Sequence, residues 1–225
     1  MSFLNIAIDG PSGAGKSTLA KKLAAALGFL YVDTGAIYRT VGLFAARNGV
    51  DCADADRVVP LLATIVIRIA YGQDDLQHMY LFGEDVTDDI RRNEVSVYAS
   101  QVSAIPQVRI FLLEMQRSLA QKNNVVMDGR DIGTVVLPHA DLKIFLTASP
   151  ERRAERRRLE LLEKGENLPF ETVLAEILAR DEADANRPVA PLREAEDAVR
   201  VDTSQINLEE SLSVLRRVVK EKLNL

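Results

Sequence analysis

Residues 10–18 read Gly-Pro-Ser-Gly-Ala-Gly-Lys-Ser-Thr, and this stretch decides the fold. It matches the pattern G-x-x-x-x-G-K-[ST], which is typical of a phosphate-binding loop between a strand and a helix. The apolar run 3–8 before the loop suits a buried strand, and Leu19, Leu23 and Leu27 after it repeat at helical spacing. The context that the motif requires is therefore present, and we expect the chain to bind a nucleoside triphosphate.

The residue types of the loop explain how it would hold phosphates. Gly10, Gly13 and Gly15 lack a Cβ, so the backbone can adopt positive φ and come close to a ligand. Successive N–H groups and the N-terminus of the following helix then attract an anion. Lys16 is expected to reach the β- and γ-phosphates, and the Ser17 hydroxyl to bind Mg²⁺. The expected ATP-binding residues of the loop are Gly10, Pro11, Ser12, Gly13, Ala14, Gly15, Lys16, Ser17 and Thr18.

Composition limits the classes of protein that fit. The chain has 225 residues, 47% hydrophobic and 27% charged, which suits one globular domain with subdomains or two small domains. A net charge of −5 argues against a general binder of nucleic acid or membrane surfaces. The single cysteine, Cys52, excludes an intramolecular disulfide, and two histidines with one cysteine exclude the common zinc sites. No leader pattern or long apolar run is evident, so we expect a cytoplasmic protein.

Short apolar runs alternate with helical segments and predict an α/β fold with a five-stranded parallel sheet covered by helices on both faces. The expected strands are 3–8, 29–33, 124–128, 142–147 and 198–202. The expected helices are 17–28, 35–48, one starting at Pro106, 149–165, 170–183 and 207–223. Residues 64–86 interrupt the alternation and predict an inserted antiparallel hairpin, with turns at 72–75 and 83–85.

Charged clusters occur where strands are expected to end. Residues 33–39 follow the second strand and residues 128–133 follow the third, so both should face the phosphate-binding loop. Asp128 is placed like the acid that holds Mg²⁺ in such proteins. The alternative interpretations are a helix cap at Thr34 and a surface Arg–Asp pair after Asp128. Residues 180–187 alternate in charge and taken alone favour a solvent-exposed helix face.

The helix expected after the fourth strand carries five arginines within seven positions, more than its nearby acids can neutralise. These are Arg152, Arg153, Arg156, Arg157 and Arg158. A mobile arginine lid that stabilises a transferring phosphoryl group is the functional interpretation.

Together these stretches resemble the bacterial cytidylate kinases over nearly the whole chain. The matching segments are IDGPSGAGK at 8–16, GAIYR at 35–39, ASQV at 99–102, DGRD at 128–131, KIFL at 143–146 and RPVAPL at 187–192. The resemblance implies one kinase domain over 1–225. Its implied parts are a core of 1–33, 112–148 and 166–225, a monophosphate-binding region of 34–111 with the β insert at 64–86, and a helical lid of 149–165.

The resemblance also implies residue roles. The implied CMP-binding residues are Arg39, Arg130 and Arg187 for the phosphate, Thr34, Arg180 and Asp184 for the sugar, and Ser100, Arg109 and Asp131 for the base. The implied ATP-binding residues of the lid are Arg153, Arg156 and Arg157. The implied catalytic residues are Lys16, Arg130, Arg153 and Arg157, and the implied Mg²⁺ ligands, directly or through water, are Ser17 and Asp128. Thr34 departs from the serine common in the family but keeps the hydroxyl.

The implied reaction is Mg²⁺-dependent transfer of the ATP γ-phosphoryl group to CMP or dCMP by a monomer, without nucleic-acid or membrane partners. A nucleotide phosphate is already a dianion near neutral pH, so arginines rather than a general base are needed. Asp131 could accept from the cytosine amino group, which uracil lacks. Two alternatives stay open. One is a kinase for UMP, AMP or a non-nucleotide alcohol, and for the alcohol Asp33 is the candidate general base. The other is a nucleotide-dependent switch.

Overall fold

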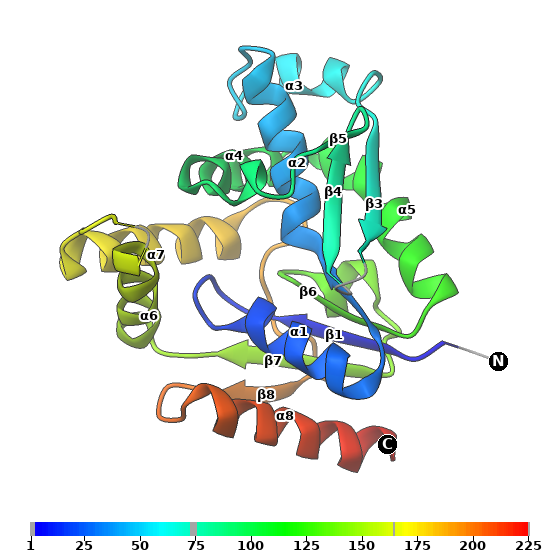
Figure 1. Cartoon of the computed structure of the whole chain (residues 1–225), viewed down its shortest axis with the longest axis vertical. Helices are drawn as coiled ribbons and strands as arrows, with labels where there is room; N and C mark the ends of the chain where they lie inside the picture. The colour runs from blue at the N-terminus through cyan, green and yellow to red at the C-terminus, as the bar shows by residue number, and fades with distance from the viewer. Residues whose placement is uncertain (1–2, 73–75, 164, 225) are drawn as a thin grey trace. The chain divides into compact units, whose positions relative to one another are not determined.

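The computed structural model describes residues 3–72, 76–163 and 165–224. Its residues group into two compact units, the first formed by Met1–Phe29 with Asn124–Leu225 and the second by Leu30–Asn123 (Figure 1). This grouping reflects packing within each unit. The functional division into core, acceptor-binding region and lid stays a prediction.

The first unit is built on parallel strands. Its elements are β1 Asn5–Asp9, α1 Lys16–Leu27, β6 Val125–Gly129, β7 Leu142–Thr147, α6 Pro150–Glu163, α7 Phe170–Asn186, β8 Val199–Asp202 and α8 Leu208–Leu223. Strand β1 pairs in parallel with β6 and β7, and β7 pairs in parallel with β8. With β2 Leu30–Asp33, the order in the five-stranded sheet is β2-β6-β1-β7-β8. The predicted parallel sheet with helices is confirmed.

Burial explains why these strands read as continuous apolar runs. Ile6, Ala7 and Ile8 in β1 are fully buried, as are residues 125–127 in β6. Strands buried on both faces need no alternation of apolar and polar residues. Helices α1 and α8 pack on each other, and α8 also contacts β7 and β8. Gly28, with φ 66°, caps the C-terminus of α1 as expected.

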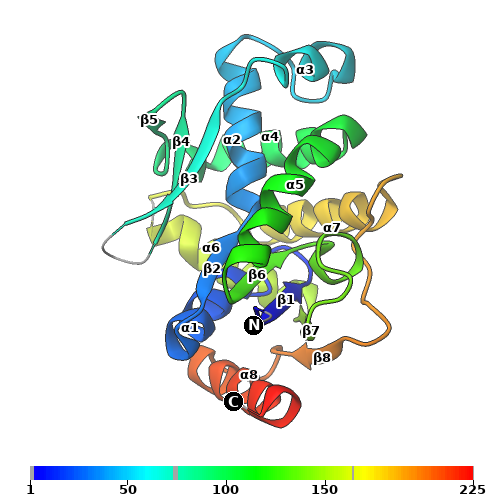
Figure 2. The same cartoon turned by 90° about the vertical axis from the view of Figure 1, so that its right-hand side faces the viewer.

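The second unit combines helices with a small sheet. After β2 its elements are α2 Thr34–Arg47, α3 Ala55–Leu61, β3 Ile67–Tyr71, β4 Gln77–Leu81, β5 Glu84–Asp85, a 3₁₀ turn Asp89–Arg91, α4 Asn93–Ser103 and α5 Pro106–Lys122. Strands β3, β4 and β5 form an antiparallel sheet in that order beside α2 (Figure 2).

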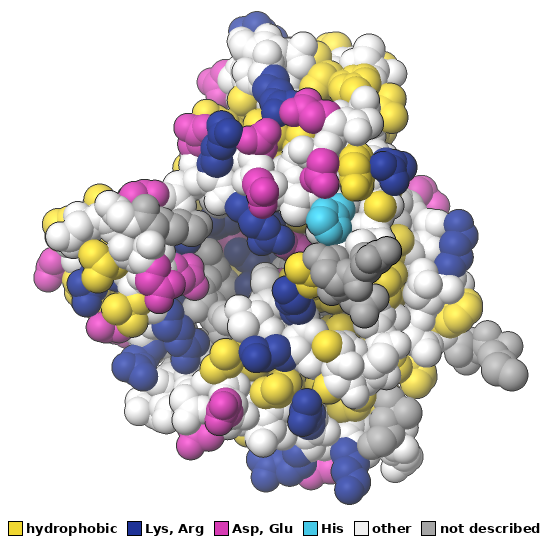
Figure 3. All heavy atoms as spheres, viewed as in Figure 1, with side chains coloured by type: hydrophobic (Ala, Val, Ile, Leu, Met, Phe, Trp, Pro, Cys, Tyr) yellow, Lys and Arg dark blue, Asp and Glu magenta, His cyan; other side chains and the backbone are white. Residues whose placement is uncertain are grey.

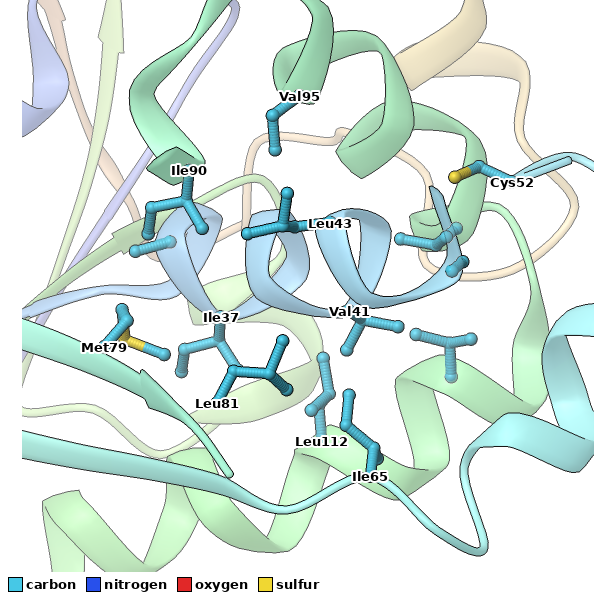
Figure 4. Packing of buried hydrophobic residues seen from close by; sticks show 14 of the residues in the cluster. Ile37, Val41, Leu43, Cys52, Ile65, Met79, Leu81, Ile90, Val95 and Leu112 are labelled. Atoms are coloured by element: carbon cyan, nitrogen blue, oxygen red, sulfur yellow. The ribbon is translucent and has the colours of Figure 1, made fainter. Parts of the chain in front are cut away.

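The core of the second unit surrounds α2. Figure 4 shows Ile37 of α2 near Met79 and Leu81 of β4. Cys52 belongs to the same buried cluster, and its thiol donates to the carbonyl of Gly42 at 3.5 Å. This packing joins the inserted sheet to the helix that begins with the residues predicted to bind the acceptor.

The structure corrects several expectations for elements. Residues 84–85, expected in a turn, form β5, because the reversal occurs one step earlier at Phe82 and Gly83, both with positive φ. The insert is therefore a three-stranded sheet rather than a hairpin. Of the other expected turn, 72–75, residues 73–75 lie outside the described residues. Helices α3 and α4 and a π-helical turn at Ile132–Val136 were not predicted, and α7 runs on to Asn186. In the described ranges, no helix is both long and apolar enough to cross a membrane.

Candidate nucleotide-binding site

The loop between β1 and α1 has the backbone that its glycines predict. Gly10, Gly13 and Gly15 have φ values of 149°, 73° and 86°. A Cβ on Gly10 would lie 1.9 Å from the carbonyl oxygen of Leu146 at the end of β7. Only glycine fits there, because both the φ value and the close approach exclude a side chain.

Lys16 is held against this loop. Its ammonium group donates to the carbonyl of Pro11 at 2.7 Å, and the side chain is buried. Burial and then the charge of Arg130 hold the pKa of Lys16 well below its ordinary value, while Asp128 and Asp184 act in the opposite direction. A phosphate beside Lys16 would favour the charged ammonium again, which suits a group that binds the β- and γ-phosphates.

Ser17 and Asp128 bring two oxygen ligands together. The Ser17 hydroxyl donates to a carboxylate oxygen of the buried Asp128 at 2.9 Å. Asp128 lies on β6 opposite Ile8 of β1, so the sheet register places it beside the start of α1. Among the described residues no group of three or more acidic, histidine or cysteine side chains could hold a metal. The pair fits Mg²⁺, which typically uses one or two protein oxygens together with phosphates and water.

Asp9, at the end of β1, was not predicted as a site residue. One carboxylate oxygen accepts the backbone N–H of Ile132 at 2.8 Å and the other accepts that of Gly133 at 2.7 Å. Burial raises the pKa of Asp9 to about 6, although the two backbone donors act to lower it. Asp9 directly precedes Gly10, so it ties the start of the phosphate-binding loop to the π-helical turn that follows Asp131.

Predicted CMP-binding residues of the first unit form ion pairs with one another. Arg130 Nε donates to Asp184 at 2.8 Å, and Arg187 Nη2 lies 3.6 Å from a carboxylate oxygen of Asp131. Burial acts to raise the pKa of Asp184, but Arg130, Arg180 and Arg187 outweigh it and the pKa is lowered. Asp184 is 6% exposed, so this part of 180–187 is not the solvent-exposed face that its sequence alone favours.

The arginines of α6 divide into a buried one and several outer ones. Arg153 is 3% exposed and forms a two-pronged ion pair with Asp181 at 3.0 and 2.6 Å. It also donates to the carbonyl of Ser12 in the phosphate-binding loop at 3.0 Å. Arg156 donates to the carbonyl of Thr203 at 2.7 Å, and Arg157 Nη1 lies 3.3 Å from a carboxylate oxygen of Glu160.

Figure 3 shows lysine and arginine side chains gathered over the region of α6. Arg152, in the first turn of α6, donates to the carbonyl of Ser204 at 3.0 Å. The N-terminal turns of α6 are thus tied to neighbouring backbone of the same unit. Closure of this helix on ATP stays a prediction.

The second unit holds the remaining predicted CMP-binding residues. Thr34, buried, is the first residue of α2, and Arg39 lies one turn further on. Arg109 on α5 is 8% exposed and donates to the carbonyl of Ser103, near the end of α4. Ser100 lies on the same turn of α4, where its carbonyl accepts from the Ser103 hydroxyl.

Asp33, the candidate base for an alcohol acceptor, is engaged within this unit. One oxygen accepts the Ala36 N–H at 2.9 Å and the other accepts from Arg39 at 2.8 Å. A carboxylate so paired is poorly placed to take a proton from a substrate hydroxyl.

Sequence reasoning missed Asp9, Asp181 and Gln77. Asp9 had one signal, its position directly before Gly10. Asp181 and Gln77 act on residues far away in the sequence, Arg153 and Asp33, so no local pattern indicated them.

The site combines a glycine-lined phosphate-binding loop, the buried Lys16, the Ser17–Asp128 oxygen pair and arginines paired with carboxylates. These features define the class of the protein as a P-loop kinase. The family model described as cytidylate kinase matches residues 6–221, and the chain belongs to this family. Membership implies ATP as the phosphoryl donor and nucleotides as substrates.

Curated relatives match nearly the full length. A cytidylate kinase of Caldicellulosiruptor bescii is 50% identical over 220 residues, covering 98% of this chain and 96% of the relative. One from Carboxydothermus hydrogenoformans is 49% identical over 219 residues, covering 97% and 98%. Among solved structures, an uncharacterized protein from Eubacterium ventriosum matches with a TM-score of 0.53 at 11% identity, covering 96% of this chain and 98% of that one, which shows a shared fold.

Proposed function

We propose that the protein transfers the γ-phosphoryl group of ATP to CMP or dCMP in a Mg²⁺-dependent reaction, giving ADP with CDP or dCDP. The observation that carries this proposal is the presence of two ion pairs, Arg130–Asp184 and Arg187–Asp131. They join the residues after β6 to the end of α7, in the unit that contains the phosphate-binding loop. A switch protein that only hydrolyses a nucleotide has no need of such a second anion-binding cluster.

Arginines supply what this reaction needs. Two phosphate groups repel each other, and fixed guanidinium groups offset that repulsion with bidentate, permanently charged donors. Arg39, Arg130 and Arg187 would hold the acceptor phosphate. Because that phosphate is a dianion near neutral pH, no side chain has to remove a proton from it.

The donor side uses the phosphate-binding loop. Its backbone N–H groups and Lys16 would hold the β- and γ-phosphates, and Arg153, Arg156 and Arg157 would stabilise the charge of the transferring group. Ser17 and Asp128 would hold Mg²⁺, which would neutralise part of the phosphate charge. Catalysis then consists of positioning and electrostatic stabilisation.

Base choice rests on three side chains. Asp131 would accept from the cytosine amino group, and Ser100 and Arg109 would donate to its acceptors. Uracil would place a carbonyl opposite the Asp131 carboxylate and leave buried polar groups unpaired. Thr34, Arg180 and Asp184 would contact the sugar. We also propose that the protein is cytoplasmic and monomeric. Light scattering of the purified protein tests the monomer, and fractionation of cells tests the location.

The experiment is ADP formation from ATP and Mg²⁺ with CMP, dCMP, UMP, AMP or no acceptor. Turnover confined to CMP and dCMP supports the proposal. Turnover with another acceptor keeps a kinase and refutes the base-reading residues, and ATP loss without any acceptor favours the switch.

A substitution sharpens this test. Asp131→Ala should reduce the preference for CMP over UMP by about 10- to 100-fold, because it removes a charged hydrogen-bond acceptor. Asp56→Ala, which removes an exposed carboxylate on α3, is the control. An unchanged preference in Asp131→Ala would contradict the assignment.

A further inference from the structure

Gln77, the first residue of β4, pairs with the backbone of Asp33 at the end of β2. Its Oε1 accepts the Asp33 N–H at 2.9 Å, and its Nε2 donates to the Asp33 carbonyl at 3.1 Å. The Gln77 side chain is 6% exposed. One side chain thus satisfies both backbone groups of Asp33, as a neighbouring strand would.

Asp33 in turn holds Arg39. One carboxylate oxygen caps α2 by accepting the Ala36 N–H, and the other accepts from Arg39 Nη2 at 2.8 Å. The side chains of this ion pair are only 8% and 20% exposed, for Asp33 and Arg39 respectively. The guanidinium of Arg39 is therefore fixed by a residue that is itself fixed by the inserted sheet.

The space beside Arg39 supports the same arrangement. A Cβ on Gly35 would lie 3.1 Å from Arg39 Nη1 and 3.1 Å from Asp33 Oδ1. The guanidinium therefore lies close over the glycine backbone. Arg39 Nε is buried and has no hydrogen-bond partner among the described residues. A buried donor without a partner is costly unless a ligand supplies the acceptor.

A second contact ties the insert to β2. The Tyr71 hydroxyl, at the end of β3, donates to the carbonyl of Tyr31 at 3.0 Å. Strands β3 and β4 therefore each hold β2, which leads directly into α2, against the inserted sheet. The ends of two strands would together limit how far Asp33 can move.

We propose that Gln77 and Asp33 are positioning residues for Arg39, so that the β3-β4-β5 sheet sets the grip on the phosphate of the acceptor nucleotide. This inference rests on the proposed function, in which Arg39 contacts that phosphate. Gln77 touches no substrate and acts through Asp33. A free arginine side chain loses rotamer freedom when it binds, and holding it in place beforehand removes that loss.

The experiment compares Gln77→Leu with Gln121→Leu, which makes the same change at an exposed position on α5. Three quantities are measured, the KM for CMP, the KM for ATP and the inhibition constant of cytidine, which lacks the phosphate. Gln77→Leu should raise the KM for CMP about tenfold and leave the other two unchanged. A purely structural role would lower the melting temperature and the active fraction without this selectivity for the phosphate.

Gly35→Ala gives a second, independent variant. Alanine in the first turn of α2 favours the helix, but its Cβ would also lie 3.1 Å from the Asp33 oxygen that caps α2, so these two effects on the melting temperature oppose each other. The added methyl group crowds the guanidinium, so the KM for CMP should still rise severalfold. The inhibition constant of cytidine should stay unchanged in this variant, and a loss of folding would not separate the KM for CMP from cytidine binding.

The decisive comparison is a double-mutant cycle with Arg39→Ala. In that background, Gln77→Leu should no longer change the KM for CMP, because the residue it positions is gone. An unchanged KM for CMP in Gln77→Leu, an equal loss of cytidine binding, or an effect that persists without Arg39 overturns the inference.

Three other outcomes are also decisive. If Gln77→Leu does not fold, an unchanged KM in Gly35→Ala overturns the inference. If the wild-type protein does not phosphorylate CMP, the proposed function fails and the inference fails with it. A wild-type enzyme active on CMP with unaffected variants refutes the positioning role alone.

Discussion

Asp9 carries a buried negative charge at neutral pH, and replacing it with asparagine should change how stability depends on pH. Its pKa is raised from 3.8 to about 6 by burial in the folded protein. Because the folded-state pKa lies above the unfolded one, the folded protein binds more protons between these two values. The stability that Asp9 contributes is therefore full below its unfolded pKa and is lost as pH rises through about 6.

The magnitude follows from the two pKa values. A difference of about two units corresponds to roughly 3 kcal/mol of stability over the full titration. Between about pH 4.5 and about pH 7.5, where the unfolded state is already mostly ionised, about 2 kcal/mol of this remains. Asparagine keeps one acceptor for the N–H groups of Ile132 and Gly133, so its own penalty should not vary with pH.

The assay is scanning calorimetry of the wild type and Asp9→Asn, without nucleotides, across this pH range. The melting temperature of the wild type relative to Asp9→Asn should fall by about 4–8 °C from the acid to the neutral end. Other titrating groups cancel in this difference, and Asp56→Asn provides the surface control. Two curves that stay parallel across the range would refute the reasoning, because Asp9 would then titrate alike in both states.

Two further substitutions test the phosphate-binding loop. Gly10→Ala should abolish ATP binding in titration calorimetry, because its Cβ would lie 1.9 Å from a backbone oxygen of β7; ordinary ATP affinity would contradict the loop geometry. Arg153→Lys should raise the KM for ATP and lower the melting temperature by a few degrees, because lysine cannot pair with both oxygens of Asp181 and also donate to Ser12. An unchanged KM and melting temperature in this variant would show that the contacts of Arg153 with Asp181 and Ser12 are dispensable.

Local patterns predicted the parts of the fold that depend on local sequence. The ends of all five strands of the parallel sheet were predicted within a residue or two, because buried parallel strands are short apolar runs. Helix α3 was missed because it has seven residues and contains Pro60. Strand β5 has two residues and exists only through its pairing with Tyr80 and Leu81, which no periodicity reveals.

In the candidate site, too, the residues of local motifs were predicted, and most contacts between residues distant in the sequence were missed. Lys16 and Ser17 belong to one contiguous motif, and the sheet register brings Asp128 to them. The burial of Asp184 depends on Arg130, which lies 54 residues away in the sequence, so its own charged neighbours pointed to solvent instead. Gln77 and Asp33 are 44 residues apart, and only the folding of the insert against β2 brings them together.

Cys52 makes this protein convenient for labelling chemistry. It is the only cysteine in the sequence, it is 2% exposed, and burial raises the pKa of its thiol. A native thiol that is both hidden and protonated reacts slowly with maleimides and other thiol reagents. Cysteines introduced on the surface would therefore take up fluorophores or spin labels selectively, without first removing the natural one. One label on each unit would follow the distance between the units through the catalytic cycle.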